Sequence, residues 1–256
     1  MKILAKKSPG QHFLIDSQII DKIIALIQPN TQQFLIEVGA GKGILTQHII
    51  SFLPNFCVVE LDDRMISLLS NKFPQLTIIH QDILTVKFTE ITAKPIFLIG
   101  NFPYYISGQL IAFIIENHKF IENVIGMFQL EVALRLCAAP NTKNYGIPSV
   151  LMQYFFETEV MMTIPNTAFL PIPKVQSAIV KLTHKKELRL VNIEQFTKTV
   201  KTAFAKRRKQ LHNNFHPLIL PEKYRTMRAE MLSLSDFVLI TNFLYTNEKS
   251  NKCEII

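Results

Sequence analysis

Residues 34–43 read FLIEVGAGKG, an apolar run that leads directly into three glycines at alternate positions. A short apolar run bounded by turn residues is typical of a buried strand. Glycine lets the backbone turn tightly and approach a ligand closely. The stretch therefore predicts a buried strand over residues 34–38 that carries a ligand-facing loop at its carboxyl end.

The spacing of these glycines narrows the class of ligand. Gly43 comes too soon after Gly39 and Gly41 for the dinucleotide fingerprint G-x-G-x-x-G. A phosphate-binding P-loop is excluded, because no Gly-Lys-Ser/Thr follows a four-residue gap. A nicotinamide enzyme is therefore disfavoured and a P-loop nucleotidase is ruled out.

Apolar runs and helical patterns alternate through the first two thirds of the chain. Such alternation implies βαβ units and a parallel sheet. Two β-like stretches, 150–156 and 177–183, flank a Pro-rich loop over 167–174 and are expected to close the sheet with an antiparallel edge. The remaining strands are expected at 34–38, 57–61, 77–80, 96–99 and 124–128, and the helices near 17–27, 43–52, 63–72, 107–117 and 130–137.

The composition changes near residue 185, where the pattern becomes helical and basic. We therefore predict two domains, 1–184 and a small helical appendage, 185–256. A helix of the appendage is expected to turn one apolar face inward and to carry the basic cluster KRRK, residues 206–209, on its other faces. Its apolar positions recur at helical spacing and are Phe196, Val200, Ala203, Phe204 and Leu211.

The chain of 256 residues has 28 basic against 20 acidic side chains, which gives a net charge of +8. This charge favours an anionic partner such as a nucleic acid or a membrane surface. No stretch predicts a signal peptide or a transmembrane span. Cys57, Cys137 and Cys253 are too far apart to predict a disulfide framework or a CxxC metal site. We expect a cytosolic protein that binds neither a metal nor a membrane.

Two acidic residues lie at or just past the carboxyl ends of the next two expected strands. Glu60 lies about 20 residues past the glycines, where the acid of a nucleotide-binding βαβ unit binds ribose hydroxyls. Asp82 ends the third strand and could accept a hydrogen bond from an adenine amino group. A helix-capping role for Glu60 and a turn role for Asp82 are the alternatives. Together with the glycine loop they favour a nucleoside cofactor without a demanding phosphate site, and S-adenosylmethionine fits those terms.

Residues 101–107, NFPYYIS, follow the fourth expected strand. Taken alone they fit an ordinary strand-to-helix turn, because Asn and Pro are common loop residues. Together with 37–43, 60–62 and 81–82, however, NFPY resembles the successive motifs of S-adenosylmethionine-dependent adenine-N6 methyltransferases.

Further motifs resemble one family of these enzymes, the ribosomal RNA adenine dimethyltransferases, over residues 8–183. They are GQHFL at 10–14, QLEVALR at 129–135, YGIPSV at 145–150 and FLPIPKVQSA at 169–178. The resemblance implies an α/β fold. It consists of a Rossmann-like methyltransferase domain with a mostly parallel seven-stranded sheet and a small all-helical C-terminal domain.

The resemblance assigns the chemistry to NFPY and to the Pro-rich loop. The side-chain carbonyl of Asn101 is expected to accept one hydrogen of the adenine amino group, and a backbone carbonyl at Phe102 or Pro103 the other. Pro103 stiffens the turn, and Tyr104 offers an aromatic face for the base. Phe169 is the candidate for the second stacking face, with a buried core Phe as the alternative.

The cofactor-contacting positions of the family also have counterparts here. His12 stands where many members have Asn, Leu130 where Lys is expected, and His212 where Arg is expected. The last two changes would weaken contact with RNA. The implied cofactor-binding residues are His12, Leu14, Gly39, Gly41, Glu60, Asp82 and Asn101.

The appendage carries AFAKRRKQLHN at 203–213 and RAEMLS at 228–233, which resemble the KsgA type of the family. That type dimethylates two adjacent adenines in a hairpin near the 3′ end of 16S ribosomal RNA. The resemblance thus implies 16S RNA in an immature small ribosomal subunit as the partner, and a monomer is expected. The predicted RNA-binding residues are Lys206, Arg207, Arg208 and Lys209.

Three alternatives stay open from the sequence. One is an Erm-type enzyme that methylates 23S RNA, because that type shares the first domain. Another is a non-catalytic RNA-binding or ribosome-assembly factor, because a methyltransferase fold need not methylate. A protein or DNA methyltransferase of the NPPY type is disfavoured by the Pro-rich loop and the basic appendage.

Overall fold

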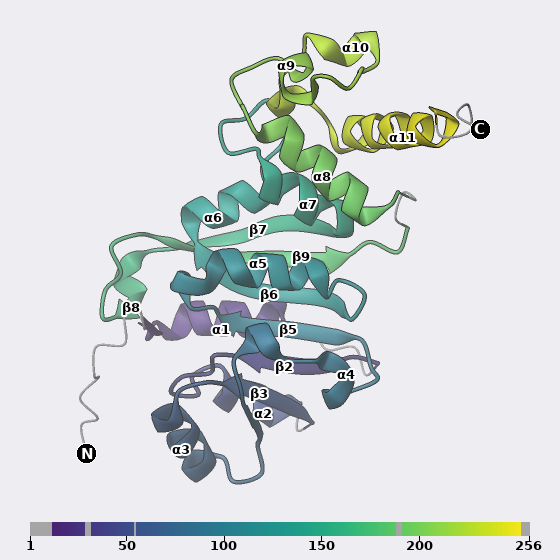
Figure 1. The fold of residues 1–256 in the computed structure, drawn as a ribbon. Coiled ribbons are helices and arrows are strands. Elements are labelled where there is room, and N and C mark those ends of the chain that lie inside the picture. The colour runs from purple at the N-terminus through teal and green to yellow at the C-terminus, as the bar shows by residue number, and fades with distance from the viewer. Residues whose placement is uncertain (1–11, 29–31, 54, 188–190, 252–256) are drawn as a thin grey trace. The chain divides into compact units, whose positions relative to one another are not determined.

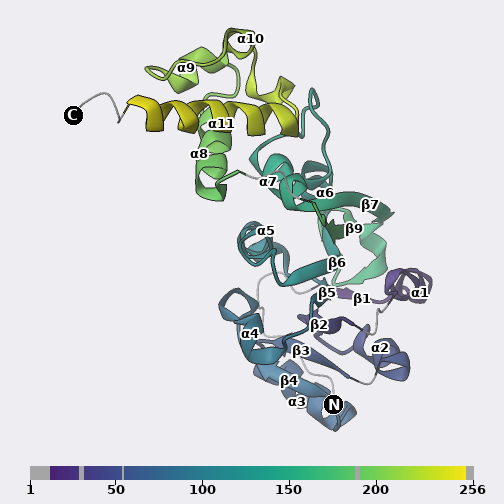
Figure 2. The same ribbon diagram turned by 90° about the vertical axis from the view of Figure 1, so that its right-hand side faces the viewer.

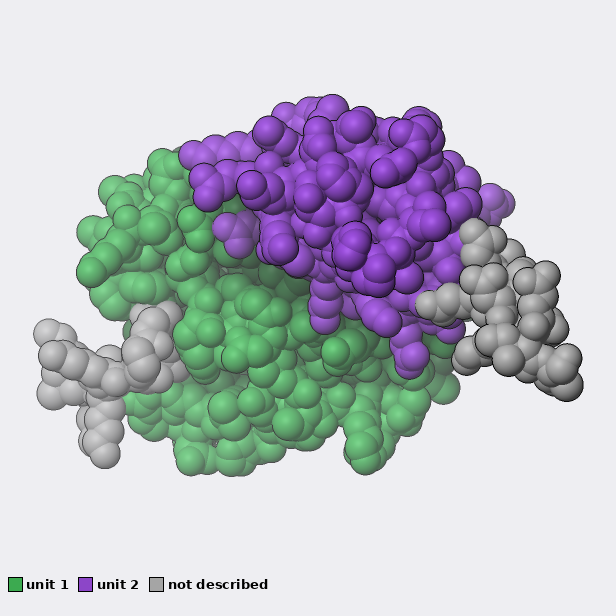
Figure 3. Space-filling model, turned by 45° about the horizontal axis from the view of Figure 1, so that its top comes forward, with its two compact units in different colours: residues 1–133, 157–184 green, residues 134–156, 185–256 purple. Residues whose placement is uncertain are grey.

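The computed structural model describes residues 12–28, 32–53, 55–187 and 191–251 (Figure 1). The chain forms two compact units, which Figure 3 shows in different colours. Unit 1 comprises residues 1–133 and 157–184, and unit 2 comprises 134–156 and 185–256. The chain passes from unit 1 to unit 2 after residue 184, which is where the domain boundary was expected. The segment 134–156, which the prediction assigned to the first domain, belongs to unit 2.

Unit 1 is built on a seven-stranded sheet with the strand order β4-β3-β2-β5-β6-β9-β7. The strands from β4 to β6 pair in parallel, and β9 pairs antiparallel to β6. This arrangement confirms the predicted α/β fold with a mostly parallel sheet. The strands are β2 (Phe34–Val38), β3 (Phe56–Glu60), β4 (Thr77–His80), β5 (Ile96–Asn101), β6 (Ile121–Gln129), β7 (Phe156–Ile164) and β9 (Ser177–His184).

Helices cover both faces of this sheet. Figure 2 shows α1 and α2 on one side of the strands and α4 and α5 on the other. Ile23 of α1, Ile49 of α2 and Leu69 of α3 join strand residues such as Val58 in one apolar core. Because βαβ crossovers bury a parallel sheet on both faces, its strands read as continuous apolar runs. The helices of unit 1 are α1 (Ser17–Leu26), α2 (Thr46–Phe52), α3 (Asp63–Lys72), α4 (Phe88–Ile91) and α5 (Ser107–Glu116), and α6 (Leu130–Leu136) begins in unit 1 and ends in unit 2.

A second sheet of two short strands was not predicted. In it β1 (Phe13–Leu14) pairs antiparallel with β8 (Phe169–Leu170), which lies in the Pro-rich loop. Phe13 is opposite Leu170, and Leu14 is opposite Phe169. This pairing holds the segment that precedes α1 against a loop about 155 residues later in the chain, and both flank the site described below.

The strand predicted at 150–156 is wrong, because most of this stretch forms helix α7 (Ile147–Phe155). The helix begins with Pro148 in its first turn, and the Oγ of Ser149 accepts the backbone N–H of Gly146. Proline and a capping hydroxyl are helix-start signals. An apolar run without clear alternation is ambiguous between strand and helix, so these signals should have decided the prediction.

Unit 2 is helical around a core that includes Phe196, Val200 and Phe237. The ring of Tyr154 in α7 packs at 4.5 Å from the ring of Phe196 in α8, which explains why α7 groups with the appendage. The phenol of Tyr145 donates to the carbonyl of Leu232. Its other helices are α8 (Ile193–Phe204), α9 (Leu211–Phe215), α10 (Glu222–Arg225) and α11 (Leu234–Asn251).

Two negative findings apply to the described ranges of the chain. None of their helices combines the length and the hydropathy that a bilayer-spanning segment needs. The same ranges hold no cluster of three or more His, Cys, Asp or Glu side chains placed to bind a metal ion.

Candidate active site

The glycine loop after β2 adopts a backbone conformation that few other residues tolerate. Gly39, Gly41 and Gly43 have φ angles of +67°, +55° and +73°. These values lie in the left-handed region, where a Cβ atom clashes with the backbone. At Gly41 a Cβ would also lie 3.1 Å from the ring of Phe13 in β1. The loop with these three glycines, which we call the glycine cradle, therefore packs closely against β1.

A cavity of about 310 Å³ opens beside this loop, at the carboxyl ends of β2, β3 and β5. Open α/β sheets bind their ligands at this edge. The structure brings together every cofactor-binding residue that the sequence predicts. Those residues, His12, Leu14, Gly39, Gly41, Glu60, Asp82 and Asn101, all line the cavity, as do Phe102, Pro103 and Tyr104.

Glu60 holds the loop and the end of β3 together. Its carboxylate accepts backbone N–H groups from Gly41 at 3.0 Å, Leu61 at 2.9 Å and Asp62 at 3.0 Å. A carboxylate offers about four acceptor positions, so one remains for a hydroxyl of a ligand. Glu60 thus holds the backbone of the loop in place, a role similar to the helix-capping role that the sequence left as an alternative. It is also a candidate for binding ribose.

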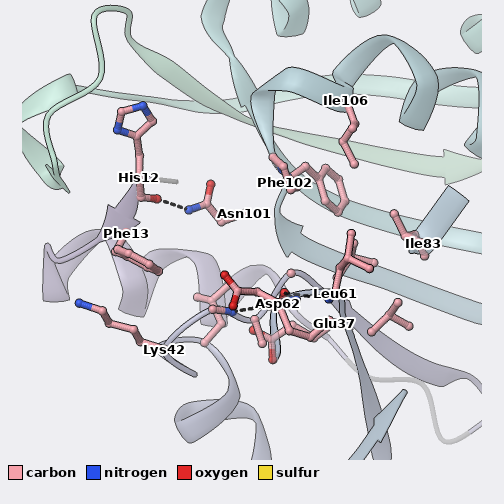
Figure 4. A pocket seen from close by; sticks show the side chains of 18 of the residues that line it. His12, Phe13, Glu37, Lys42, Leu61, Asp62, Ile83, Asn101, Phe102 and Ile106 are labelled. Carbon is pink, nitrogen blue, oxygen red and sulfur yellow. Dashed lines mark hydrogen bonds between the residues drawn. The ribbon is translucent and has the colours of Figure 1, made fainter. Parts of the chain in front are cut away.

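Asp82 caps a short 3₁₀ turn, η1 (Ile83–Thr85), by accepting the N–H of Leu84 at 3.0 Å through Oδ1. This is the turn role that the sequence left as an alternative. Asp82 also lines the cavity next to Ile83. Leu61, Ile83 and Ile106 lie together around this end of the cavity (Figure 4) and give it apolar walls suited to a nucleobase.

The charges around the loop match a ligand without phosphates. Lys42 does not extend its ammonium group as a P-loop lysine would, since Nζ lies 4.5 Å from the centre of the Phe13 ring. Figure 4 shows Lys42 and Phe13 side by side. Carboxylate acceptors, apolar walls and a glycine cradle fit the nucleoside and amino-acid parts of S-adenosylmethionine.

Asn101, the last residue of β5, has its side chain oriented by His12, the residue before β1. Its Nδ2 donates to the main-chain carbonyl of His12 at 2.9 Å (Figure 4). Because the amide nitrogen is used in this way, Oδ1 is left to accept a further hydrogen bond. An amide carbonyl at the cavity wall can accept from an amino group without removing its proton outright.

Two other residues of the NFPY turn are held in place, Phe102 by a ring contact and Tyr104 by a hydrogen bond. Phe102 is 1% exposed, and its ring meets that of Phe128 edge to face at 5.2 Å. The Tyr104 hydroxyl is hydrogen-bonded to Oγ of Ser177 at 2.5 Å. Burial raises the pKa of Tyr104, so its phenol stays neutral near pH 7. Tyr105, by contrast, is 62% exposed at the cavity.

Phe169 does not line the cavity. It is 1% exposed and belongs to the apolar core of unit 1, because its place in β8 directs the ring inward opposite Leu14. The structure therefore favours the alternative that the sequence left open, a buried core Phe, over a stacking role.

Glu37 is a feature of the site that sequence reasoning overlooked. This carboxyl is 1% exposed at the cavity wall and accepts a hydrogen bond from Thr46 Oγ1 at 2.7 Å. Burial raises its pKa to about 7, against the lowering effect of Thr46 and with a further increase from Glu60. The sequence could have indicated this site residue, because Glu37 is a carboxyl near the end of a buried strand and next to the glycines.

The basic cluster of unit 2 differs from the prediction. Helix α8 ends at Phe204, so Lys206, Arg208 and Lys209 lie exposed in the turn that follows, and not on a helix face. Arg207 is held by the protein itself. It pairs with Glu230 at 2.8 Å and donates to the carbonyls of Thr142 and Lys143.

A mostly parallel sheet, a glycine cradle and an amide that ends a central strand define a class of protein, the S-adenosylmethionine-dependent methyltransferases. Comparisons with known proteins agree. Curated relatives called ribosomal RNA small subunit methyltransferase A are 38% identical in Flavobacterium johnsoniae, over 94% of this chain and 95% of that protein, and 40% identical in Francisella tularensis subsp. novicida, over 95% and 98%.

A crystal structure of a dimethyladenosine transferase from Plasmodium falciparum shares the fold, with a TM-score of 0.81 and 24% identity over 93% of this chain and 98% of that one. The family model described as ribosomal RNA adenine dimethylase matches residues 3–244. The chain belongs to this family of ribosomal RNA adenine dimethylases. It is accordingly an S-adenosylmethionine-dependent enzyme that acts on ribosomal RNA adenines.

Proposed function

We propose that this enzyme dimethylates the N6 amino groups of two adjacent adenines in a hairpin near the 3′ end of 16S RNA, within an immature small ribosomal subunit in the cytoplasm. The observation that carries the adenine chemistry is the orientation of Asn101, whose amide nitrogen is bonded to His12 so that Oδ1 is free to accept. The small-subunit target is supported by the names of the relatives that are 38–40% identical.

The residues of the site make the adenine amino nitrogen more nucleophilic by holding its hydrogens in place. Its lone pair is delocalised into the ring, so it is a weak nucleophile. Acceptance of its hydrogens by Asn101 Oδ1 and by a backbone carbonyl of the turn favours a more tetrahedral nitrogen. Bound S-adenosylmethionine would supply the methyl group on a cationic sulfur, and its carbon–sulfur bond would break as the nitrogen–carbon bond forms. The nitrogen then loses one proton to water, and no strong base is needed.

The target base must leave its stack to reach Asn101, at a cost of a few kcal/mol. Tyr104 offers it an aromatic face, and Ser177 fixes the phenol that carries this face. Unit 2 serves in this proposal as an RNA-binding domain. Its exposed Lys206, Arg208 and Lys209 contact phosphates, while Arg207 stabilises the turn that presents them.

A methylation assay tests the proposed target. Labelled S-adenosylmethionine is offered with small subunits that lack adenine dimethylation and, separately, with unmethylated 23S RNA, and the modified base is mapped by mass spectrometry. Two adjacent dimethyladenines in the 16S hairpin are expected. A mark on 23S RNA would support the Erm-type alternative. RNA binding without transfer to either would support an assembly factor that does not methylate.

A further inference from the structure

Two histidine side chains of unit 1 meet in a direct hydrogen bond, and neither of them lines the cavity. Nδ1 of His118 lies 3.1 Å from Nε2 of His184. The ring planes differ by 5°, and the ring centres are 5.4 Å apart. Because the two nitrogens are much closer together than the ring centres, the rings meet edge to edge in nearly one plane. One imidazole nitrogen therefore donates directly to the other.

This hydrogen bond lies at the end of the pairing between β6 and β9. His118 is in the turn between α5 and β6, where its main-chain carbonyl accepts the N–H of Ile121. His184 is the last residue of β9. The backbone register of the two strands reaches Asn123 opposite Thr183. The side-chain bond thus ties β9 to the turn before β6 one residue beyond that pair, and the chain enters unit 2 directly afterwards.

The number of protons on the pair decides whether this bond can form. An N–H···N bond needs one nitrogen that carries a proton and one that offers a lone pair. Two neutral imidazoles meet this condition, and so does a pair with one added proton, in which an imidazolium donates to a neutral ring. A second added proton places a hydrogen on both facing nitrogens and a positive charge on both rings. The two rings then repel each other, and the bond is lost.

The surroundings of His118 resist that second proton. Its pKa is lowered to about 4, first by burial and then by the charges of His184 and Lys119. Within the described residues, no carboxylate is among the groups that shift this pKa. Glu122 on β6 is hydrogen-bonded to Gln33 at 2.7 Å instead. The first added proton therefore goes to His184, and its charge opposes a proton on His118.

The other charged residues next to the pair in the sequence are bonded elsewhere or exposed to solvent. Nζ of Lys185 donates to the main-chain carbonyl of Gln153 at 2.7 Å. Glu116, Lys186 and Glu187 are exposed. Water and salt screen exposed charges, so their effect on a partly buried ring is weak. The charges that decide the state of the bond are therefore those of the two imidazoles.

We propose that the His118–His184 bond is an acid-sensitive latch on the end of β9. The latch is closed with no added proton or with one, and it opens when both imidazoles are protonated. The unfolded chain protonates His118 at its ordinary pKa of 6.5, whereas the folded chain keeps it neutral down to about 4. The stability that the latch contributes is therefore complete above pH 6.5 and is lost as the pH falls from 6.5 to 4. This inference does not depend on the RNA that the enzyme methylates.

Nuclear magnetic resonance of the full chain, isotope-labelled at its histidine ring nitrogens, tests the latch. Two nitrogens that share a hydrogen-bonded proton are magnetically coupled, so a coupling between the rings of His118 and His184 reports the closed state directly. Hydrogen exchange of the last amides of β9, corrected for the intrinsic rate, reports how firmly that end of the strand is held. Both are followed from about pH 7.5 to about pH 4.

Three variants separate the latch from ordinary packing. His184→Gln keeps a side chain that can donate or accept by turning its amide and that never takes a charge. His184→Ala removes the bond at every pH. His48→Gln, on α2 and outside the cavity lining, is the matched control.

In the wild type we expect a ring coupling at neutral pH, its loss as the pH approaches 4, and roughly 10-fold faster exchange at the end of β9 in acid. His184→Ala should exchange faster at every pH, His184→Gln should lose the acid effect, and His48→Gln should follow the wild type. The absence of a ring coupling at neutral pH would overturn the proposal. So would exchange that stays constant while both rings become protonated, or an acid effect of wild-type size in His184→Gln.

Discussion

Oδ1 of Asn101 is available at the cavity because the Nδ2 atom of the same side chain lies 2.9 Å from the carbonyl oxygen of His12. The two residues are 89 positions apart in the chain. The amide is therefore oriented by the residue that precedes β1, so the position of this acceptor depends on the segment before β1 as well as on β5.

Asn101→Ala should leave the fold and cofactor binding largely intact while it lowers the rate of methyl transfer by roughly 100-fold or more. Asn101→Asp should also be poor, although it keeps an acceptor, because a carboxylate cannot donate to the carbonyl of His12. Single-turnover transfer and cofactor calorimetry check both. Full activity of Asn101→Ala would remove this side chain from the mechanism.

Glu60→Ala should weaken cofactor binding roughly 10- to 100-fold, because three backbone N–H groups of the loop lose their acceptor. Glu60→Gln should be less harmful, since one amide oxygen can still accept. The cofactor dissociation constant measures the effect. Unchanged affinity in Glu60→Ala would show that these hydrogen bonds serve the fold alone.

Glu37 should make stability depend on pH. Its pKa rises from 4.5 to about 7 on folding, so the folded state binds its proton more tightly than the unfolded state. Its contribution to stability is complete below about pH 4.5 and is lost as the pH rises through 7, by about 3 kcal/mol in all. Glu37→Gln should therefore raise the free energy of unfolding at pH 8 and change it little at pH 4.5.

Urea unfolding at the two pH values tests this expectation. Glu116→Gln on the exposed side of α5 is the matched control and should keep the pH profile of the wild type. A Glu37→Gln profile parallel to that of the wild type would mean that Glu37 is ionised in the folded protein at pH 5.

Substitutions of the neighbouring residues Arg207 and Arg208 should have different effects on stability and on RNA binding. Arg208→Gln should weaken RNA binding and reduce its salt dependence by about one counterion, because Arg208 is exposed. Arg207→Gln should instead lower the stability of unit 2 by about 1 kcal/mol, since Arg207 is bound to Glu230 and to two carbonyls. Salt titrations of RNA binding and thermal unfolding separate the effects, with Lys87→Gln in unit 1 as the control.

Gly126→Ala should be strongly destabilising, because its Cβ would lie 2.2 Å from the ring of Phe102. We expect a loss of roughly 2–3 kcal/mol and lower activity, since that ring supports the NFPY turn. Gly108→Ala in α5 meets no atom within 4 Å and should be neutral or stabilising by up to about 1 kcal/mol. Equal melting temperatures of the two variants would contradict this account of the turn.

The parallel sheet and most of the cavity were predictable, because buried strands and their carboxyl-terminal residues leave local patterns in the sequence. Phe34–Val38 and the residues that follow it are such a case. The β1–β8 pair was not predictable, since two-residue strands leave no periodic signal and their pairing joins distant segments. The same holds for Phe169, whose burial depends on that pairing, and for Arg207, whose partners lie in other segments of unit 2.

The β1–β8 ribbon also has a consequence for the order in which the protein is made. Chains emerge from the ribosome with the N-terminus first. A nascent chain that ends near residue 133 already holds the five parallel strands and Asn101, but Pro171 and Ser177, which position His12 and Tyr104, have not yet been synthesised. The sheet can form early in synthesis, whereas the side chains of His12 and Tyr104 acquire these hydrogen-bond partners only after two thirds of the chain has been translated.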